Sequence, residues 1–282
     1  PGIPFPDKLQ PVAAVKEALE DAQVVLFSAP AQHFRSALDN ALPFISQDMI
    51  IINVAKGIEQ KTLKRMSEIA RDKMSNMKYV VLSGPSHAEE VGLGLPTTVV
   101  VASTDIKLAE YVQDIFMTDK FRVYTNSDVI GVEIGGALKN IIALGAGISD
   151  GMGYGDNAKA AMMTRGIAEI ARLGVKLGAD IHTFSGLTGI GDLVVTCTSM
   201  HSRNRRCGIL IGEGMKPKEA TEKVGMVVEG MYTTEAAYEL AKREGVEMPI
   251  TEGIYAVIND KIDARDAVNQ LMTRDKKSEI MF

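Results

Sequence analysis

The sequence predicts an α/β protein in which a doubly wound, mostly parallel sheet is followed by an all-α domain. Between residues 12 and 126, short β-rich runs alternate with segments of helical periodicity, which is typical of β-α-β units. After about residue 128 only helical periodicity remains. We therefore expect a sheet domain over residues 1–128 and a helical domain over residues 129–282, with the binding site in the cleft between them.

Five strands are expected in the first domain. Residues 1–11 contain four prolines and should be irregular, whereas residues 12–21 have helical spacing. The β-rich runs are short and apolar and end in turn residues, as strands buried in a parallel sheet do. The expected strands lie at residues 23–30, 49–57, the start of 78–94, 96–103 and 121–126, and the expected helices begin near Gln32 and cover about 59–74, a short stretch within 78–94, and 106–116.

Helices alone are expected in the second domain, because its apolar residues recur at three- and four-residue spacing. The tail, residues 272–282, is charged and should end a last helix or fray. The expected helices lie at residues 129–148, 156–175, about 203–213, 231–244 and 249–259.

The composition argues against a nucleic-acid-binding or membrane protein. Of the 282 residues, 46% are hydrophobic and 24% charged, and the net charge of −5 lacks the basic excess that phosphate-backbone binding needs. Uninterrupted apolar runs, such as those at residues 49–52 and 79–82, are far shorter than the roughly 20 residues of a bilayer span. The two cysteines form no Cys-x-x-Cys pattern and the histidines are scattered, so we expect a cytoplasmic protein without a metal site.

A lysine in an unusual setting, Lys139, is the first candidate for chemistry. It stands beside Asn140 within residues 131–166, a stretch of small and apolar residues with helical spacing. If the turn around Lys139 faces protein, desolvation lowers the pKa of its ammonium and makes it a proton donor or acceptor. The alternative is that Lys139 reaches the surface from an ordinary amphipathic helix.

The turns that follow three of the expected strands are the second candidate. Ligands of open α/β sheets bind beyond the carboxyl ends of the strands. Residues 28–30, 54–57 and 83–86 combine small residues that allow a ligand to approach the backbone closely. Lys56 is the only charged residue directly after a buried strand; taken alone, such a lysine is more often a solvated loop residue, but its position at a strand end favours a functional role.

A third candidate is the cluster formed by residues 189–196 and residues 202–206. Asp192 and Thr196 are four residues apart, so in a helix they share a face. Ser202 is a suitable N-cap, which would place Arg203 and Asn204 in a first helical turn, where free amides and the helix dipole attract an anion. A guanidinium there opposes the dipole unless a phosphate is bound. The alternative is a solvated basic face.

Residues 224–230 form the weakest candidate. Val227 and Glu229 are positioned to contact a cofactor, but composition alone predicts only a loop before a helix that starts near Thr233.

Taken together, five separated motifs resemble the bacterial NAD(P)-dependent glycerol-3-phosphate dehydrogenases along nearly the whole chain. Because the motifs occur in the family's order, their combination is far more specific than any one of them. The motifs are LSGPSHAEE at 82–90, GGALKNIIALGAGISDG at 135–151, FSGLTGIGDLVVTCT at 184–198, HSRNRR at 201–206 and VVEG at 227–230.

The resemblance implies a Rossmann-like sheet domain and an oxidoreductase that interconverts dihydroxyacetone phosphate and sn-glycerol 3-phosphate for phospholipid synthesis. Its cofactor is NAD or NADP, its partner a small phosphorylated substrate, and its assembly a homodimer. The family opens with a β-α-β unit carrying Gly-x-Gly-x-x-Gly, and nothing of that kind precedes Pro1. We therefore expect the sheet to lack its first strands, and the choice between NADH and NADPH stays open. Alternatives are a non-catalytic binding fragment and a related two-domain reductase for another oxo-acid.

The resemblance also implies individual roles. Lys139 is the general acid and base, and Lys56 serves both substrate and cofactor. No metal ligand is expected. The residues expected at the substrate are Lys56, Gly84, Ser86, Asn140, Asp192, Thr196, Ser202, Arg203 and Asn204, and those expected at the cofactor are Lys56, Ala88, Arg203, Val227 and Glu229.

Overall fold

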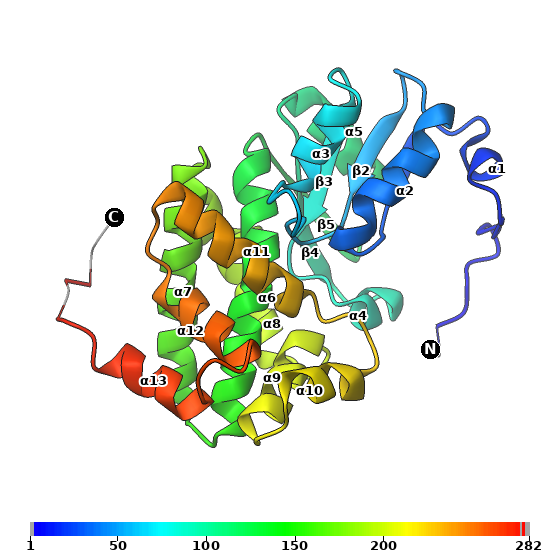
Figure 1. The fold of residues 1–282 in the computed structure, drawn as a ribbon. Helices are drawn as coiled ribbons and strands as arrows, with labels where there is room; N and C mark the ends of the chain where they lie inside the picture. The colour runs from blue at the N-terminus through cyan, green and yellow to red at the C-terminus, as the bar shows by residue number, and fades with distance from the viewer. Residues whose placement is uncertain (1–2, 277, 280–282) are drawn as a thin grey trace.

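A five-stranded sheet joined to a group of helices makes up the computed structural model of this protein, which describes residues 3–276 and 278–279 (Figure 1). Each expected strand is present, although most are shorter than the apolar runs that predicted them. Hydrogen bonds join the strands in chain order from one edge to the other. The strands are β1 (Val24–Phe27), β2 (Ile50–Asn53), β3 (Lys78–Ser83), β4 (Thr97–Ala102) and β5 (Phe121–Asn126).

The sheet is mostly parallel, as expected, with one reversal. β1, β2 and β3 run parallel to one another, and β4 runs parallel to β5. β3 and β4 are antiparallel, with Val81 opposite Ala102. The chain between them contains only the five-residue helix α4 (Ala88–Gly92). Since a parallel return needs a longer crossover, usually with a full helix, β4 instead re-enters from the end at which β3 finishes.

Helices cover both faces of the sheet. Ile51 points to the face covered by α2 (Phe34–Ala41) and α3 (Met66–Lys73), where it packs with buried residues such as Phe34 and Ile69. Its neighbours Ile50 and Ile52 point to the opposite face, which is covered by α5 (Ile106–Phe116). All three isoleucines are buried because β2 lies within the sheet, which explains its unbroken apolar sequence.

One expected helix is much shorter than its pattern. The helix predicted over about residues 59–74 begins only at Met66. Leu63 has a φ of 58°, which a right-handed helix excludes. Glu59 instead pairs with Arg35 at 2.7 Å, and the helix start is fixed by Glu68, whose side chain accepts from the backbone N–H of Arg65 at 2.9 Å. Tertiary contacts therefore replace the first turns of the predicted helix.

The long helix α6 (Val129–Gly151) is the core of the helical part, and Figure 1 shows it between the sheet and the other helices. By length and composition it is apolar enough to cross a bilayer, but 94% of its most apolar window is buried by the surrounding chain. Such burial is the pattern of the central helix of a helical domain.

Three of the helices around α6 were not delimited by the sequence pattern. They are α8 (Asp192–Thr198), α10 (Pro217–Val224) and α13 (Ala264–Met272). The helix α11 (Glu229–Glu244) begins four residues before the predicted Thr233. The remaining helices are α1 (Val15–Leu19), α7 (Asp156–Lys176), α9 (Arg203–Gly212) and α12 (Pro249–Ile258).

Glycines bring α6 and α9 into direct backbone contact. A Cβ atom added at Gly208 would lie 2.1 Å from the carbonyl oxygen of Leu144, and one at Gly147 would lie 2.2 Å from that of Arg205. No side chain fits at either position, because atoms that close overlap. The crossing therefore fixes the distance between the first turn of α9 and the middle of α6, where Lys139 lies.

Candidate active site

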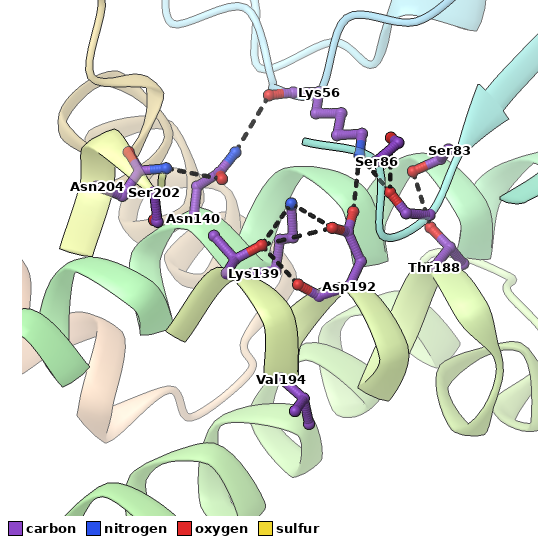
Figure 2. Close-up of polar contacts among 12 residues, drawn as sticks. Lys56, Ser83, Ser86, Lys139, Asn140, Thr188, Asp192, Val194, Ser202 and Asn204 are labelled. Atoms are coloured by element: carbon purple, nitrogen blue, oxygen red, sulfur yellow. Dashed lines mark hydrogen bonds and ion pairs between the residues drawn. The ribbon is translucent and has the colours of Figure 1, made fainter. Parts of the chain in front are cut away.

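Lys139 lies buried in the middle of α6, with 6% of its surface exposed. Its Nζ donates to Asp192 Oδ1 at 2.5 Å and to Thr196 Oγ1 at 2.8 Å (Figure 2). The alternative that this lysine reaches the solvent is therefore wrong. An ammonium has three N–H donors, and within the described residues only these two acceptors are found. One N–H of Lys139 is left for a ligand.

Asp192 connects two lysines that come from different parts of the chain. It is the first residue of α8 and is only 1% exposed. Its Oδ2 accepts from Lys56 Nζ at 2.8 Å, while Oδ1 accepts from Lys139. Thr196, one turn further along α8, donates to the Asp192 carbonyl at 2.6 Å, so its hydroxyl is oriented to accept from Lys139. The four-residue spacing thus brings both α8 side chains to one lysine.

The charges of this cluster shift the pKa values of its members. Burial lowers the pKa of Lys139 to about 8; Asp192 opposes this shift and Lys56 adds to it. Burial alone would raise the pKa of Asp192, but the two lysines outweigh it and hold that pKa below its usual value. Near neutral pH the carboxylate is therefore ionised, and the ammonium of Lys139 can release its proton within the range where enzymes operate.

The turn after β3 contacts the cluster formed by Lys56, Lys139 and Asp192. Gly84 has a φ of 131°, and an added Cβ would lie 3.0 Å from Val99 Cα, so glycine is required there. The Gly84 carbonyl accepts from Lys56 Nζ at 2.8 Å and from Ser86 Oγ at 3.0 Å. Residues at the ends of β2 and β3, predicted separately, thus meet in one place.

The predicted anion site at the start of α9 lies beside the cluster. Ser202 is the N-cap of α9, and its hydroxyl accepts from the Arg205 N–H at 3.2 Å. Arg205 itself pairs with Asp150 of α6 at 2.7 Å. Arg203 is exposed and forms no ion pair with any described residue. Unlike Arg205, Arg203 is therefore available to an anion.

Asn140 and Asn204 link the helices that surround the cluster. Asn204 Nδ2 donates to Asn140 Oδ1 at 2.9 Å, and Asn204 Oδ1 accepts from the Gly230 N–H at 2.8 Å in the first turn of α11. Asn140 Nδ2 approaches the Lys56 carbonyl at 3.5 Å. This chain of amides aligns α6, α9 and α11 around the buried lysine.

Three other expected cofactor residues, Ala88, Val227 and Glu229, lie at α4 and around the start of α11. Ala88 is the first residue of α4, and Val227 is 38% exposed ahead of α11. Glu229 Oε1 accepts from the Ala31 N–H at 3.1 Å, after β1, and its Oε2 is buried without a partner among the described residues. Burial raises the pKa of Glu229. Glu229 thus joins the start of α11 to the carboxyl edge of the sheet.

Thr188 is a supporting residue that no sequence pattern identified. Its hydroxyl donates to the Val132 carbonyl of α6 at 2.9 Å and lies 3.1 Å from Ser83 Oγ at the end of β3 (Figure 2). The only available signal was its position between the glycines of residues 186–191. The contact holds the turn before α8, and hence Asp192, against both parts of the protein.

Fold and site together define a two-domain oxidoreductase whose helical part presents a buried lysine to the carboxyl edge of a nucleotide-binding type of sheet. The family described as NAD-dependent glycerol-3-phosphate dehydrogenase matches twice: its N-terminus matches residues 1–109 and its C-terminus residues 128–269. The chain belongs to this family.

Curated relatives and solved structures agree with this assignment. Glycerol-3-phosphate dehydrogenase [NAD(P)+] of Clostridium perfringens is 56% identical over 277 residues, covering 98% of this chain and 84% of that protein. The enzyme of the same name from Clostridium acetobutylicum is 54% identical over 278 residues, with coverages of 99% and 84%. The crystal structure of glycerol-3-phosphate dehydrogenase from Coxiella burnetii superposes with a TM-score of 0.94 at 38% identity, covering 97% of this chain and 84% of that one.

Proposed function

We propose that the protein interconverts dihydroxyacetone phosphate and sn-glycerol 3-phosphate with NADH or NADPH, as a source of glycerophospholipid precursors. Membership of the family supports this reaction. The single structural observation that carries it is the buried Lys139, whose Nζ has two protein acceptors and one N–H to spare. Residues 1–128 serve as the cofactor domain and residues 129–282 as the catalytic domain.

In ketone reduction Lys139 supplies the proton. The bound cofactor supplies hydride to carbon 2 of the ketone. As negative charge develops on the ketone oxygen, the Lys139 ammonium stabilises it and donates a proton to it. Asp192 and Thr196 hold the resulting amine in place through the same two hydrogen bonds. In the reverse direction the neutral amine takes the proton of the alcohol, so one residue serves both directions.

The start of α9 holds the phosphate of the substrate. The free backbone amides of its first turn, the Ser202 cap and the unpaired Arg203 side chain form a concentrated set of donors. The glycine contacts pack α9 directly against α6, the helix that carries Lys139. The other residues proposed to bind the substrate are connected to Lys139 or to α9 through the contacts described above; they are Lys56, Gly84, Ser86, Asn140, Asp192, Thr196 and Asn204.

We expect Arg203→Ala to weaken binding of the phosphorylated substrate about ten- to a hundredfold. A hydrogen bond to a charged group is worth roughly 1.5–3 kcal/mol, which corresponds to that change in affinity. The measurement is the Michaelis constant for dihydroxyacetone phosphate. Arg243→Ala, which removes an exposed arginine of α11, is the matched control. A Michaelis constant within a factor of about two of the wild-type value would mean that the substrate phosphate does not bind at Arg203.

The residues present fit a nicotinamide cofactor at the carboxyl edge of the sheet. Glu229 Oε2 is a buried acceptor without a partner among the described residues, and it lies close to Gly57, where an added Cβ would come within 3.3 Å of it. A buried acceptor of this kind suits an N–H or O–H donor of a ligand. Lys56, Ala88, Arg203, Val227 and Glu229 would hold the cofactor.

The decisive experiment for this function compares substrates with both cofactors in the full-length protein. We expect turnover of dihydroxyacetone phosphate and little turnover of unphosphorylated dihydroxyacetone. Equal turnover of the two ketones, or preference for a 2-oxo acid, would favour a related two-domain reductase. Absence of turnover with either cofactor would favour a binding protein.

The assembly and location of the protein follow from the same family. We infer a cytoplasmic homodimer that is not inserted in membranes, supported by the likeness to bacterial relatives and by the burial of α6. Analytical ultracentrifugation of the full-length protein tests this: a species of one chain across micromolar concentrations would contradict it.

A further inference from the structure

His87 is a titratable side chain at the site to which the proposed reaction gives no role. It directly follows Ser86 and is the N-cap of α4, in the sheet part of the chain. Its ring lies against that of His201, with ring centroids 5.8 Å apart. His201 comes two residues before α9, next to the Ser202 cap. The two rings thus connect the turn after β3 to the segment before α9, and Figure 2 shows their chain neighbours Ser86 and Ser202 on either side of Lys139 and Asp192.

One ring nitrogen of His87 is without a polar contact. Its Nε2 is buried and has no hydrogen-bond partner among the described residues. The ring also interacts with the backbone of Val195, which lies on α8 between Asp192 and Thr196. Leaving a polar atom unpaired in the interior costs about 1–3 kcal/mol, and folded proteins avoid it in all but a few cases. The unpaired Nε2 therefore indicates a ligand group beside it.

We propose that His87 is a further substrate-binding residue whose Nε2 contacts the phosphate group of the substrate. The inference rests on the proposed function. The contact with His201 places the ring beside the start of α9, where the Ser202 cap and Arg203 already suit a phosphate. In the proposed reaction the ketone oxygen is bound by Lys139. The phosphate is thus held from both parts of the protein, by α9 and by the turn after β3.

The charges around His87 predict that it takes up a proton when the phosphate binds. Burial and the nearby Lys139 lower its pKa, whereas the Val195 hydrogen bond, Asp192 and Glu89 oppose the shift. The ring is therefore neutral in the free protein near pH 7. A phosphate dianion adds opposite charge and favours the imidazolium. The proton comes from solvent, and the Nε2–H then donates to a phosphate oxygen.

The test measures His87→Ala and His87→Gln with three ligands. For His87→Ala we expect the Michaelis constant for dihydroxyacetone phosphate to rise about tenfold, the loss typical of one charged hydrogen bond. The kcat/KM for dihydroxyacetone and the Michaelis constant for the cofactor should not change. His87→Gln keeps a neutral donor of similar reach, so it should recover part of the affinity but lose the dependence of substrate affinity on pH near neutrality. His182→Ala, which removes an exposed histidine, is the control.

Three results would overturn the proposal. An equal loss of kcat/KM with dihydroxyacetone would mean that His87 contacts the hydroxymethyl end of the substrate and not the phosphate. A raised Michaelis constant for the cofactor alone would mean that His87 contacts the cofactor. Unchanged substrate affinity and pH dependence in His87→Gln would make the ring a packing residue, and this variant decides the matter if His87→Ala does not fold. Wild-type turnover of dihydroxyacetone phosphate, measured alongside, tests the proposed function independently.

Discussion

Lys139→Met is expected to reduce the turnover of dihydroxyacetone phosphate by at least about a hundredfold, the loss typical of a missing general acid. Methionine has a similar length and packs well in apolar surroundings, but it has no proton to give and no charge to stabilise an oxyanion. Cofactor binding should be nearly unchanged, because Lys139 donates its hydrogen bonds to Asp192 and Thr196, neither of which is an expected cofactor residue. The measurement is single-turnover reduction together with the Michaelis constant for the cofactor.

Two comparisons separate proton transfer from packing in this experiment. Lys139→Ala should be equally inactive and also less stable, because it leaves a cavity where the buried Lys139 side chain packs beside α6. Lys159→Met removes an ammonium paired with Asp150 elsewhere in the helical part, and it should keep wild-type turnover. If Lys139 only fills space, methionine would be tolerated and alanine would reduce mainly stability. Retention of more than about a tenth of wild-type turnover by Lys139→Met would therefore refute its role as the acid.

Asp192→Asn is expected to have the second largest effect, a loss of about a hundredfold in turnover at neutral pH. Asp192 is the group that raises the pKa of Lys139 against burial and against Lys56. Without the carboxylate, two ammonium groups face each other in a buried site, so Lys139 loses its proton at a lower pH. Because the proton donor is then scarce, turnover should recover in part as the pH is lowered, which a pH series on the variant measures.

The matched control for this variant is Glu169→Gln. Glu169 is another buried carboxyl group of the helical part, where it accepts from the N–H groups of Ile250 and Thr251 at the start of α12, and burial raises its pKa to about 7. Its loss should alter stability and leave the pH dependence of turnover unchanged. If Asp192→Asn kept the wild-type pH dependence, the carboxylate would have no influence on the proton of Lys139.

The fold was predictable wherever local pattern and tertiary packing favour the same structure. The buried strands have unbroken apolar sequences because both of their faces are covered, and α6 has apolar residues on every side because it is the core. The reversal of β4 and the late start of α3 were not predictable in this way. The first depends on where a short connection returns the chain, and the second on a single left-handed residue, Leu63.

The site was predictable as a set of separate segments but not as an arrangement. The spacing of Asp192 and Thr196 indicated a shared helical face, and the apolar context of Lys139 indicated burial. Asp192 pairs with Lys139 and Lys56, which lie 53 and 136 positions earlier in the chain. No local sequence pattern indicates such long-range contacts. The same holds for His87, whose importance depends on an unpaired nitrogen and on a ring from the other part of the protein.

The central claim, that Lys139 exchanges a proton with the substrate at a lowered pKa, is tested most directly by kcat/KM in both directions as a function of pH. The kcat/KM reports the ionisation of the free enzyme. With the pKa of Lys139 at about 8, reduction requires the ammonium, so beyond the change that His87 imposes near neutrality its kcat/KM should begin to fall at about pH 8, by about tenfold per pH unit. Oxidation requires the amine, so its kcat/KM should rise up to about pH 8 and then level off. A kcat/KM for reduction that stays constant to about pH 10, the ordinary range of a lysine, would contradict the account.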